Sequence, residues 1–144
     1  MIFGAILAGG VGSRMNISDM PKQFLSLGNK PIIIHTLEKF LLCEKIDEIY
    51  IGVHANWLVH MEDLIDKYIK MKKDRIHVVA GGSDRNSTIM NIVAAIEKDH
   101  GESDEHYIVT HDSVRPFVTA RLLNDNVESG LKYKATDTVR VAWD

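Results

Sequence analysis

Glycines and basic side chains gather in one segment near the N-terminus that could bind phosphate. The stretch LAGGVGSRMNISDMPK, residues 7–22, contains Gly9, Gly10, Gly12, Arg14 and Lys22. Glycines let backbone N–H groups approach phosphate oxygens closely. An arginine can bind phosphate through two parallel hydrogen bonds, and a lysine supplies a point charge. The segment is typical of a loop that holds a nucleoside triphosphate during cleavage between its α- and β-phosphates; the alternative is a loop whose two cations are simply solvated.

Two common phosphate-binding motifs do not fit this segment. A P-loop requires G-x-x-x-x-G-K-[ST], but Gly12 is followed by Ser13 and Arg14, and the chain has no Gly-Lys pair. A dinucleotide-binding turn requires G-x-G-x-x-G, and Met15 stands where its third glycine belongs. The second motif is therefore present only in part.

A second polar segment, GGSDRNST, covers residues 81–88. Its two glycines would let the backbone approach the edge of a base. Ser83 and Thr88 offer hydroxyl or N–H groups that could contact a base, and Arg85 could brace the loop or face phosphate. The structural alternative is a helix start with Ser83 or Asp84 as the N-cap. Both interpretations can hold together, because helix N-termini attract anions.

A third polar segment, HDSVRP, covers residues 111–116 and contains a carboxylate suited to magnesium. Mg²⁺ is usually held by one or two carboxylates together with substrate phosphates and water. Asp112 fits that role, and Ser113 could contact a ribose. The alternative for Asp112 is an ordinary turn-forming aspartate. His111 has no second histidine or cysteine at ligand spacing nearby, which favours a structural role.

The elements that must position these segments alternate between strand and helix. Short runs of apolar and branched residues predict strands over 2–8, 48–53, 76–80, 107–110 and 136–142. Apolar residues at helical spacing predict helices over 31–42, 57–69, 85–98 and 119–131. This order predicts one α/β domain over residues 1–144, a mostly parallel sheet with helices on both faces. Ligands in such folds bind at the carboxyl ends of the strands, where the three polar segments fall.

Composition limits the functional classes. The chain of 144 residues is 45% hydrophobic and 26% charged, with a formal net charge of −3. This balance argues against a nucleic-acid partner, since such proteins usually show a basic excess. Cys43 is the only cysteine, which excludes an intramolecular disulfide. No apolar run approaches the ~18 residues of a membrane span, so we expect a cytoplasmic protein with no membrane partner.

The three segments together resemble a known family. The pattern LAGGVGSRM…PKQF, followed in order by GGSDRNST and HDSVRPF, is similar to the signature of cytidylyltransferases that join a sugar or polyol phosphate to CTP. One branch makes CDP-ribitol from D-ribitol 5-phosphate for teichoic acid synthesis. Another acts on 2-C-methyl-D-erythritol 4-phosphate in isoprenoid synthesis. The motifs resemble the ribitol branch more closely, and the fold implied is a Rossmann-like nucleotidyltransferase fold.

The resemblance also implies roles for individual residues. Arg14 and Lys22 would neutralise the α-phosphate, and Asp112 would bind Mg²⁺. Arg115 would contact the phosphate of the second substrate or brace Asp112. The residues expected to contact the nucleotide are Ala8, Gly9, Gly10, Gly12, Gly82, Ser83, Arg85, Thr88 and Ser113.

Some features of the family lie beyond Asp144. In the family an acceptor-binding threonine, a dimerisation arm and a further lysine come after this point. We therefore expect this chain to correspond to the CTP-binding portion, with poor activity on its own and a homodimer in the full-length protein. Two rival interpretations are a non-catalytic nucleotide-binding module and an NAD-binding domain.

Overall fold

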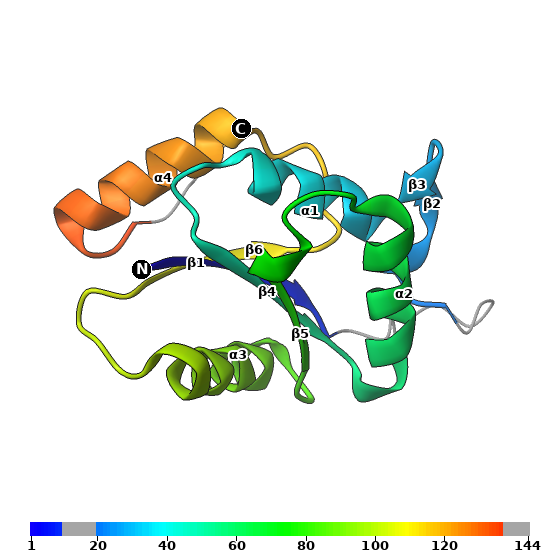
Figure 1. Cartoon of the computed structure of the whole chain (residues 1–144), viewed down its shortest axis with the longest axis horizontal. Coiled ribbons are helices and arrows are strands. Elements are labelled where there is room, and N and C mark those ends of the chain that lie inside the picture. The colour runs from blue at the N-terminus through cyan, green and yellow to red at the C-terminus, as the bar shows by residue number, and fades with distance from the viewer. Residues whose placement is uncertain (10–19, 137–144) are drawn as a thin grey trace, which may run out of the picture.

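A four-stranded parallel sheet forms the centre of the molecule (Figure 1). The computed structural model describes residues 1–9 and 20–136. The strands are β1 (Ile2–Ala8), β4 (Glu48–Val53), β5 (Ile76–Ala80) and β6 (Tyr107–Asp112), in the spatial order β5-β4-β1-β6. Along the chain, β4 pairs with one edge of β1 and β5 pairs with β4. The next strand, β6, then pairs with the opposite edge of β1. The order therefore reverses at β1, and ligands of open α/β sheets bind at such a reversal.

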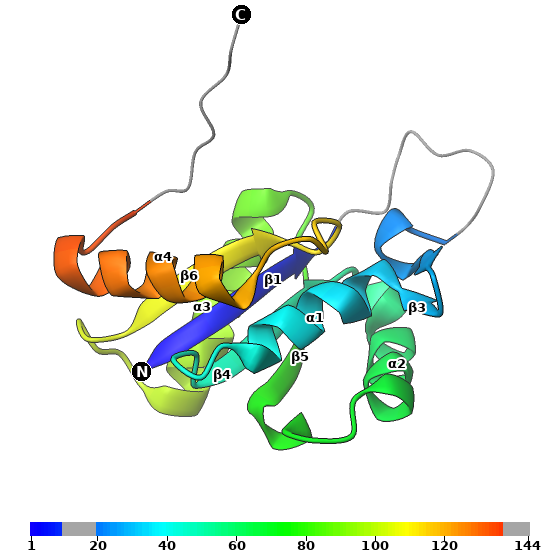
Figure 2. The same ribbon diagram turned by 90° about the horizontal axis from the view of Figure 1, so that it is seen from above.

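Helices cover both faces of this sheet, as predicted. They are α1 (Ile32–Leu42), α2 (Leu58–Tyr68), α3 (Arg85–His100) and α4 (Ala120–Tyr133). Figure 2 shows α1 and α4 on one side of the sheet and α3 on the other. Short pieces complete the described chain: 3-10 turns η1 (Lys22–Phe24), η2 (Ala55–Trp57) and η3 (Lys73–Arg75), and a small hairpin of β2 (Ser26–Leu27) and β3 (Lys30–Pro31).

The core is divided by the sheet because alternate side chains of a strand point to opposite faces. On β1, Ile6 and Ala8 pack with the side chains of α1, α2 and α4. Phe3, Ala5 and Leu7 pack with Ile92 and Ile96 of α3. β1 is buried on both faces, which explains why its sequence is continuously apolar rather than alternating.

The register brings the carboxyl ends of the strands together. Ala8 lies opposite Val53, and Val53 lies opposite Ala80. On the other side of β1, Leu7 lies opposite Asp112. The segments that follow these strands therefore start from one edge of the sheet.

Several local features differ from the sequence-based expectations. The helix predicted from Pro31 begins at Ile32, because Pro31 has an extended ψ of 148° and pairs with Ser26 in the hairpin. The apolar spacing that predicts this helix places Leu42 on its buried face, but Leu42 is 63% exposed at the helix end. β6 runs to Asp112, two residues beyond the predicted end. The strand predicted over 136–142 lies outside the described residues, apart from Thr136.

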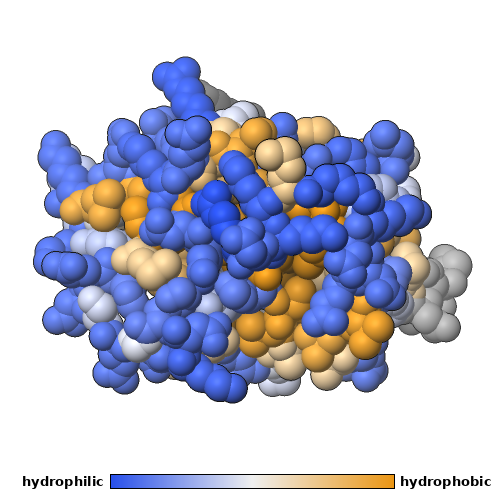
Figure 3. Space-filling view, in the orientation of Figure 1, coloured by the Kyte–Doolittle hydropathy of each residue, from blue (hydrophilic) through white to orange (hydrophobic). Residues whose placement is uncertain are grey.

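On the face shown in Figure 3, hydrophilic side chains dominate, and hydrophobic ones gather in a patch over the region between α2 and α3. Within residues 1–9 and 20–136, none of the helices has the length and apolar character needed to cross a bilayer.

Candidate nucleotide-binding site

A small cavity lies at the carboxyl edge of the sheet, between β1, β6 and the start of α3. Its volume is about 220 Å³, and it is lined by Leu7, Gly9, Gly82, Ser83, Asp84, Arg85, Thr88 and Asp112. Six of these were predicted from the sequence as site residues: Gly9, Gly82, Ser83, Arg85, Thr88 and Asp112. The structure thus brings parts of all three polar segments to one place.

The N-terminus of α3 forms one wall of this cavity. Asp84 is its N-cap, and its carboxylate accepts a hydrogen bond of 2.7 Å from the Ser87 N–H. The Ser87 hydroxyl in turn accepts from the Asp84 N–H at 3.0 Å, which completes a capping box. Hydrogen bonds from Ser87 hold the pKa of Asp84 below its ordinary value. The bond from the Ser87 backbone has the larger effect, and the bond from its side chain adds to it. Of the two predicted caps, Ser83 or Asp84, the structure selects Asp84.

Thr88 ties this helix start to the loop before it. Its side chain is 2% exposed, and its Oγ1 donates to the Asp84 carbonyl at 2.9 Å and accepts from the Gly82 N–H at 3.0 Å. The hydroxyl therefore fixes the loop that we expect to approach a base. Its own contact with cytosine stays a prediction.

Glycine is needed where the two loops meet. A Cβ atom on Gly9 would lie 2.7 Å from Thr88 Oγ1, and one on Gly81 would lie 3.2 Å from the Gly9 Cα. The Gly81 N–H also donates to the Val53 carbonyl at 2.6 Å. The end of β1 and the end of β5 can approach this closely only because both positions lack a side chain.

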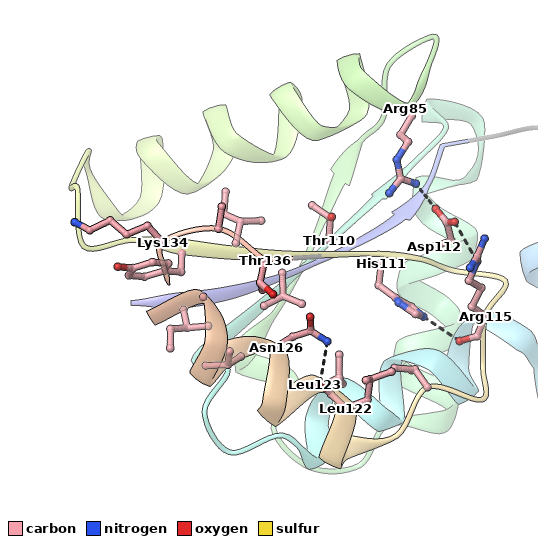
Figure 4. A pocket seen from close by; sticks show the side chains of 18 residues that line it. Arg85, Thr110, His111, Asp112, Arg115, Leu122, Leu123, Asn126, Lys134 and Thr136 are labelled. Atoms are coloured by element: carbon pink, nitrogen blue, oxygen red, sulfur yellow. Dashed lines mark hydrogen bonds and ion pairs between the residues drawn. The ribbon is translucent and has the colours of Figure 1, made fainter. Parts of the chain in front are cut away.

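Asp112 stands between two arginines at the mouth of the cavity. Figure 4 shows Arg85 and Arg115 reaching its carboxylate from two sides. Arg85 Nη1 pairs with Oδ1, and Arg115 Nε lies 3.4 Å from Oδ2. The Asp112 side chain is 34% exposed, so it remains accessible to a ligand. Two cations and one carboxylate at a sheet edge can bind phosphate and, through the carboxylate, a metal ion.

A larger groove of about 590 Å³ continues from these three residues along β6 and α4 (Figure 4). Its walls include Ile108 and Thr110 of β6, and Leu122 and Asn126 of α4. β6 is an edge strand among the described residues, so this groove follows an uncovered sheet edge rather than an enclosed pocket. The smaller cavity is the better candidate for a base or ribose, since it is where the three predicted segments meet.

Other predicted residues lie elsewhere. Lys22 begins η1, is exposed and lines neither cavity. Ser113 is only 3% exposed and lines neither cavity. Ala8 is 3% exposed. Gly10, Gly12 and Arg14 lie outside the described residues.

Two buried polar residues that the sequence did not single out contact the site's loops. Gln23 is 6% exposed, and its Nε2 donates to the Ala8 carbonyl at 2.9 Å. Thr36 on α1 is fully buried, and its Oγ1 donates to the Ser113 carbonyl at 2.8 Å. Nothing in the local pattern distinguishes these residues from ordinary loop and helix positions, because their partners are distant in sequence.

The side chains at the carboxyl edge of the sheet limit which metal ion could bind there. In the part of the chain that the structure describes, no group of three or more histidine, cysteine, aspartate or glutamate side chains is arranged to hold a metal ion. Asp84 and Asp112 both line the smaller cavity, but the Asp84 carboxylate caps α3, whereas the Asp112 carboxylate lies beside two arginines that could bind phosphate. A single carboxylate completed by substrate phosphates and water fits Mg²⁺ and not zinc, which takes three or four protein ligands.

A parallel sheet with a glycine-lined cavity, an aspartate and two arginines at its carboxyl edge is typical of nucleotide-binding α/β proteins. The chain belongs to the 2-C-methyl-D-erythritol 4-phosphate cytidylyltransferase family, IspD, which it matches over residues 2–142. The family assignment and the predicted fold class are therefore confirmed.

Curated relatives agree with this family assignment, and solved structures agree with the fold. The chain is 52% identical over 139 residues to a protein named ribitol-5-phosphate cytidylyltransferase in Streptococcus pneumoniae serotype 2, covering 96% of this chain and 59% of the relative. The 4-diphosphocytidyl-2C-methyl-D-erythritol synthase of Anaerococcus prevotii superimposes with a TM-score of 0.69 at 24% identity, over 99% of this chain and 59% of the other. The bifunctional IspDF of Campylobacter jejuni gives a TM-score of 0.67 at 21% identity, over 92% and 31%. The chain spans about three fifths of the length of these curated relatives, and the two structural likenesses show the fold alone.

Proposed function

We propose that this chain is the CTP-binding portion of a cytidylyltransferase that converts CTP and D-ribitol 5-phosphate to CDP-ribitol and pyrophosphate. The observation that carries the proposal is the 52% identity to proteins named ribitol-5-phosphate cytidylyltransferase, across 96% of the chain. The geometry supports it, since the cavity joins the segments expected to read cytosine to the carboxylate and cations expected at phosphate. The alternative acceptor, 2-C-methyl-D-erythritol 4-phosphate, is favoured by the family description.

The proposed reaction is an in-line displacement. An oxygen of the acceptor phosphate attacks the α-phosphorus of CTP, the bond to the α,β-bridging oxygen breaks, and pyrophosphate leaves. Two anions must approach each other, so positioning and charge neutralisation carry most of the catalysis. We assign to Arg14 and Lys22 the neutralisation of charge on the α-phosphate. We assign to Arg115 the binding of the acceptor phosphate.

The remaining residues would bind and orient the nucleotide. The Gly81–Gly82 backbone, held by Thr88, would face the base, with Ser83 beside it. The N-terminus of α3 and Arg85 would favour the negative charge of the triphosphate. Asp112 would hold Mg²⁺, which when bound adds positive charge against the phosphate oxygens. For a polypeptide with the full length of the curated relatives we propose a homodimer, to be checked by light scattering.

The decisive experiment is a pyrophosphate-release assay with CTP and each acceptor in turn, using the polypeptide with the full length of its curated relatives. We expect turnover with D-ribitol 5-phosphate to exceed turnover with 2-C-methyl-D-erythritol 4-phosphate, and CTP to be preferred over UTP. Preference for the erythritol acceptor would reject the ribitol assignment. Calorimetry of the 144-residue chain with CTP and Mg²⁺ distinguishes the rival interpretations. CTP binding without turnover, both in this chain and in the longer polypeptide, indicates a non-catalytic nucleotide-binding module. NADH binding without CTP binding indicates an NAD-binding domain.

A further inference from the structure

We propose that Thr36, on α1, is a positioning residue that sets the orientation of the turn carrying Asp112 and Arg115. This inference rests on the proposed function for its catalytic meaning, but the contact that carries it is independent of any ligand. Thr36 touches neither cavity and acts only through the backbone of Ser113.

The Thr36 hydroxyl donates in an unusual direction for a helical threonine. Within helices such hydroxyls usually bond back to a carbonyl three or four residues earlier in the same helix. Thr36 Oγ1 instead donates at 2.8 Å to the carbonyl of Ser113, which is 77 positions away in the chain. Thr36 is 0% exposed and Ser113 is 3% exposed, so water has little access to replace this hydrogen bond.

The backbone of Ser113 is held from both sides. Its N–H donates to the Leu7 carbonyl of β1 at 3.1 Å, which continues the pairing of β1 with β6. Its carbonyl accepts from Thr36 on α1. Together the two bonds determine the direction in which the chain leaves β6. That direction places Asp112 and Arg115, because Asp112 precedes Ser113 directly and the Arg115 N–H closes the turn on the Asp112 carbonyl at 3.3 Å.

The same face of α1 supports this turn at a second point. Phe40 lies one helical turn after Thr36, and its ring packs against His111 with centroids 5.7 Å apart. The His111 Nε2 lies 3.0 Å from the Arg115 carbonyl. Phe40 thus supplies an apolar support, and Thr36 supplies the one hydrogen bond from α1 to the turn among the bonds described. A buried carbonyl that loses its donor must reorient or stay unpaired, and unpaired buried groups are strongly disfavoured.

The consequence for function is geometric. Groups that position phosphates must be held to within about half an ångström of their productive geometry. If the Ser113 carbonyl turns to find another donor, the Asp112 carboxylate moves with it relative to Arg85 and the cavity. Thr36 therefore supports magnesium-dependent nucleotide binding without contacting either ligand.

The first test compares three variants in the ligand-free chain. Thr36→Val keeps the shape of the side chain and removes the hydroxyl, whereas Thr36→Ser keeps the hydroxyl and removes a methyl group. Ile33→Val trims another fully buried residue of the same helix and serves as the packing control. By hydrogen–deuterium exchange, we expect Thr36→Val to raise the exchange of the Ser113 and Arg115 amides about 10-fold, the size of one net hydrogen bond. Thr36→Ser and Ile33→Val should stay within about twofold of the parent chain.

The second test measures CTP affinity by calorimetry with and without Mg²⁺. We expect Thr36→Val to weaken binding in the presence of Mg²⁺ by about 10-fold, Thr36→Ser to restore it, and the difference to disappear without the metal. Unchanged amide exchange in Thr36→Val, or exchange raised equally throughout α1 and β1, would reject the positioning role. Faster exchange with unchanged CTP affinity would reject its functional part. If the parent chain does not bind CTP, the proposed function fails, while the exchange experiment still decides the role of Thr36.

Discussion

Thr88 Oγ1 lies 2.7 Å from the place that a Cβ atom would occupy on Gly9. Two segments almost eighty residues apart therefore meet without room for a methyl group. The Thr88 hydroxyl cannot move aside freely, because it bonds to both the Gly82 N–H and the Asp84 carbonyl. The contact joins the end of β1 to the start of α3 at the candidate base pocket.

Replacing Gly9 with alanine should damage both stability and nucleotide binding. The new methyl group would displace the Thr88 hydroxyl, and we expect a loss of about 1–3 kcal/mol in unfolding free energy, as for other overpacked sites. Urea unfolding and CTP calorimetry measure the two effects. Adding Thr88→Ala to Gly9→Ala removes the clash partner, so the double variant should be less destabilised than the sum of the singles. Simple additivity would show that Gly9 and Thr88 do not interact.

Replacing Lys22 with alanine should reduce turnover by roughly 10²–10³, the usual effect of deleting one charge-stabilising donor. Lys22 is exposed on η1, so the fold should be unaffected. Steady-state pyrophosphate release on a polypeptide with the full length of the curated relatives gives the rate. Lys98 is an exposed residue near the C-terminal end of α3, whose N-terminal end lines the cavity. Lys98→Ala makes the same change in net charge and should leave turnover unaltered. Near-parent turnover in Lys22→Ala would remove this lysine from the mechanism.

The cap of α3 should give a pH-dependent contribution to stability. Hydrogen bonds from Ser87 lower the pKa of Asp84 in the folded state, so folding favours the ionised carboxylate. The contribution is thus present at neutral pH and is lost as the pH falls below the ordinary aspartate pKa of about 3.9. We expect Asp84→Ala to melt below the parent chain at pH 7, with the gap narrowing toward pH 3. Asp84→Asn retains a capping side chain and should stay near the parent at pH 7; a gap for Asp84→Ala that stays constant with pH would contradict the assignment.

Two glycines outside the site should respond in opposite ways to alanine. A Cβ on Gly4 would lie 2.6 Å from Cδ2 of the fully buried Phe40, so Gly4→Ala should destabilise the fold by about 1–3 kcal/mol. Gly130 lies within α4, and a Cβ there meets nothing within 4 Å. Gly130→Ala should therefore stabilise by about 0.5–1 kcal/mol through helix propensity. Chemical denaturation measures both, and equal effects from the two changes would contradict this view of the packing.

The central elements could be predicted because their signals are local. The strands over 48–53 and 76–80 match the structure at both ends, since short runs rich in branched apolar residues are bounded there by polar residues or glycine. Helix ends were less accurate because caps depend on backbone geometry. The apolar spacing predicts Pro31 inside a helix, but Pro31 pairs in a hairpin instead. That hairpin was not predicted at all, since strands of two residues carry no periodic pattern.

The sequence by itself determined the α/β order, the three polar segments at strand ends and the resemblance to cytidylyltransferases. These depend on periodicity and on residue types at short spacing, which a linear pattern records. Only the tertiary structure decided that Arg85 reaches Asp112, that Gly9 packs on Thr88, and that Thr36 donates to the carbonyl of Ser113. Such contacts follow from strand register and from the crossover of α3 past β1. They join residues far apart in the chain, and no local pattern of side chains encodes their meeting.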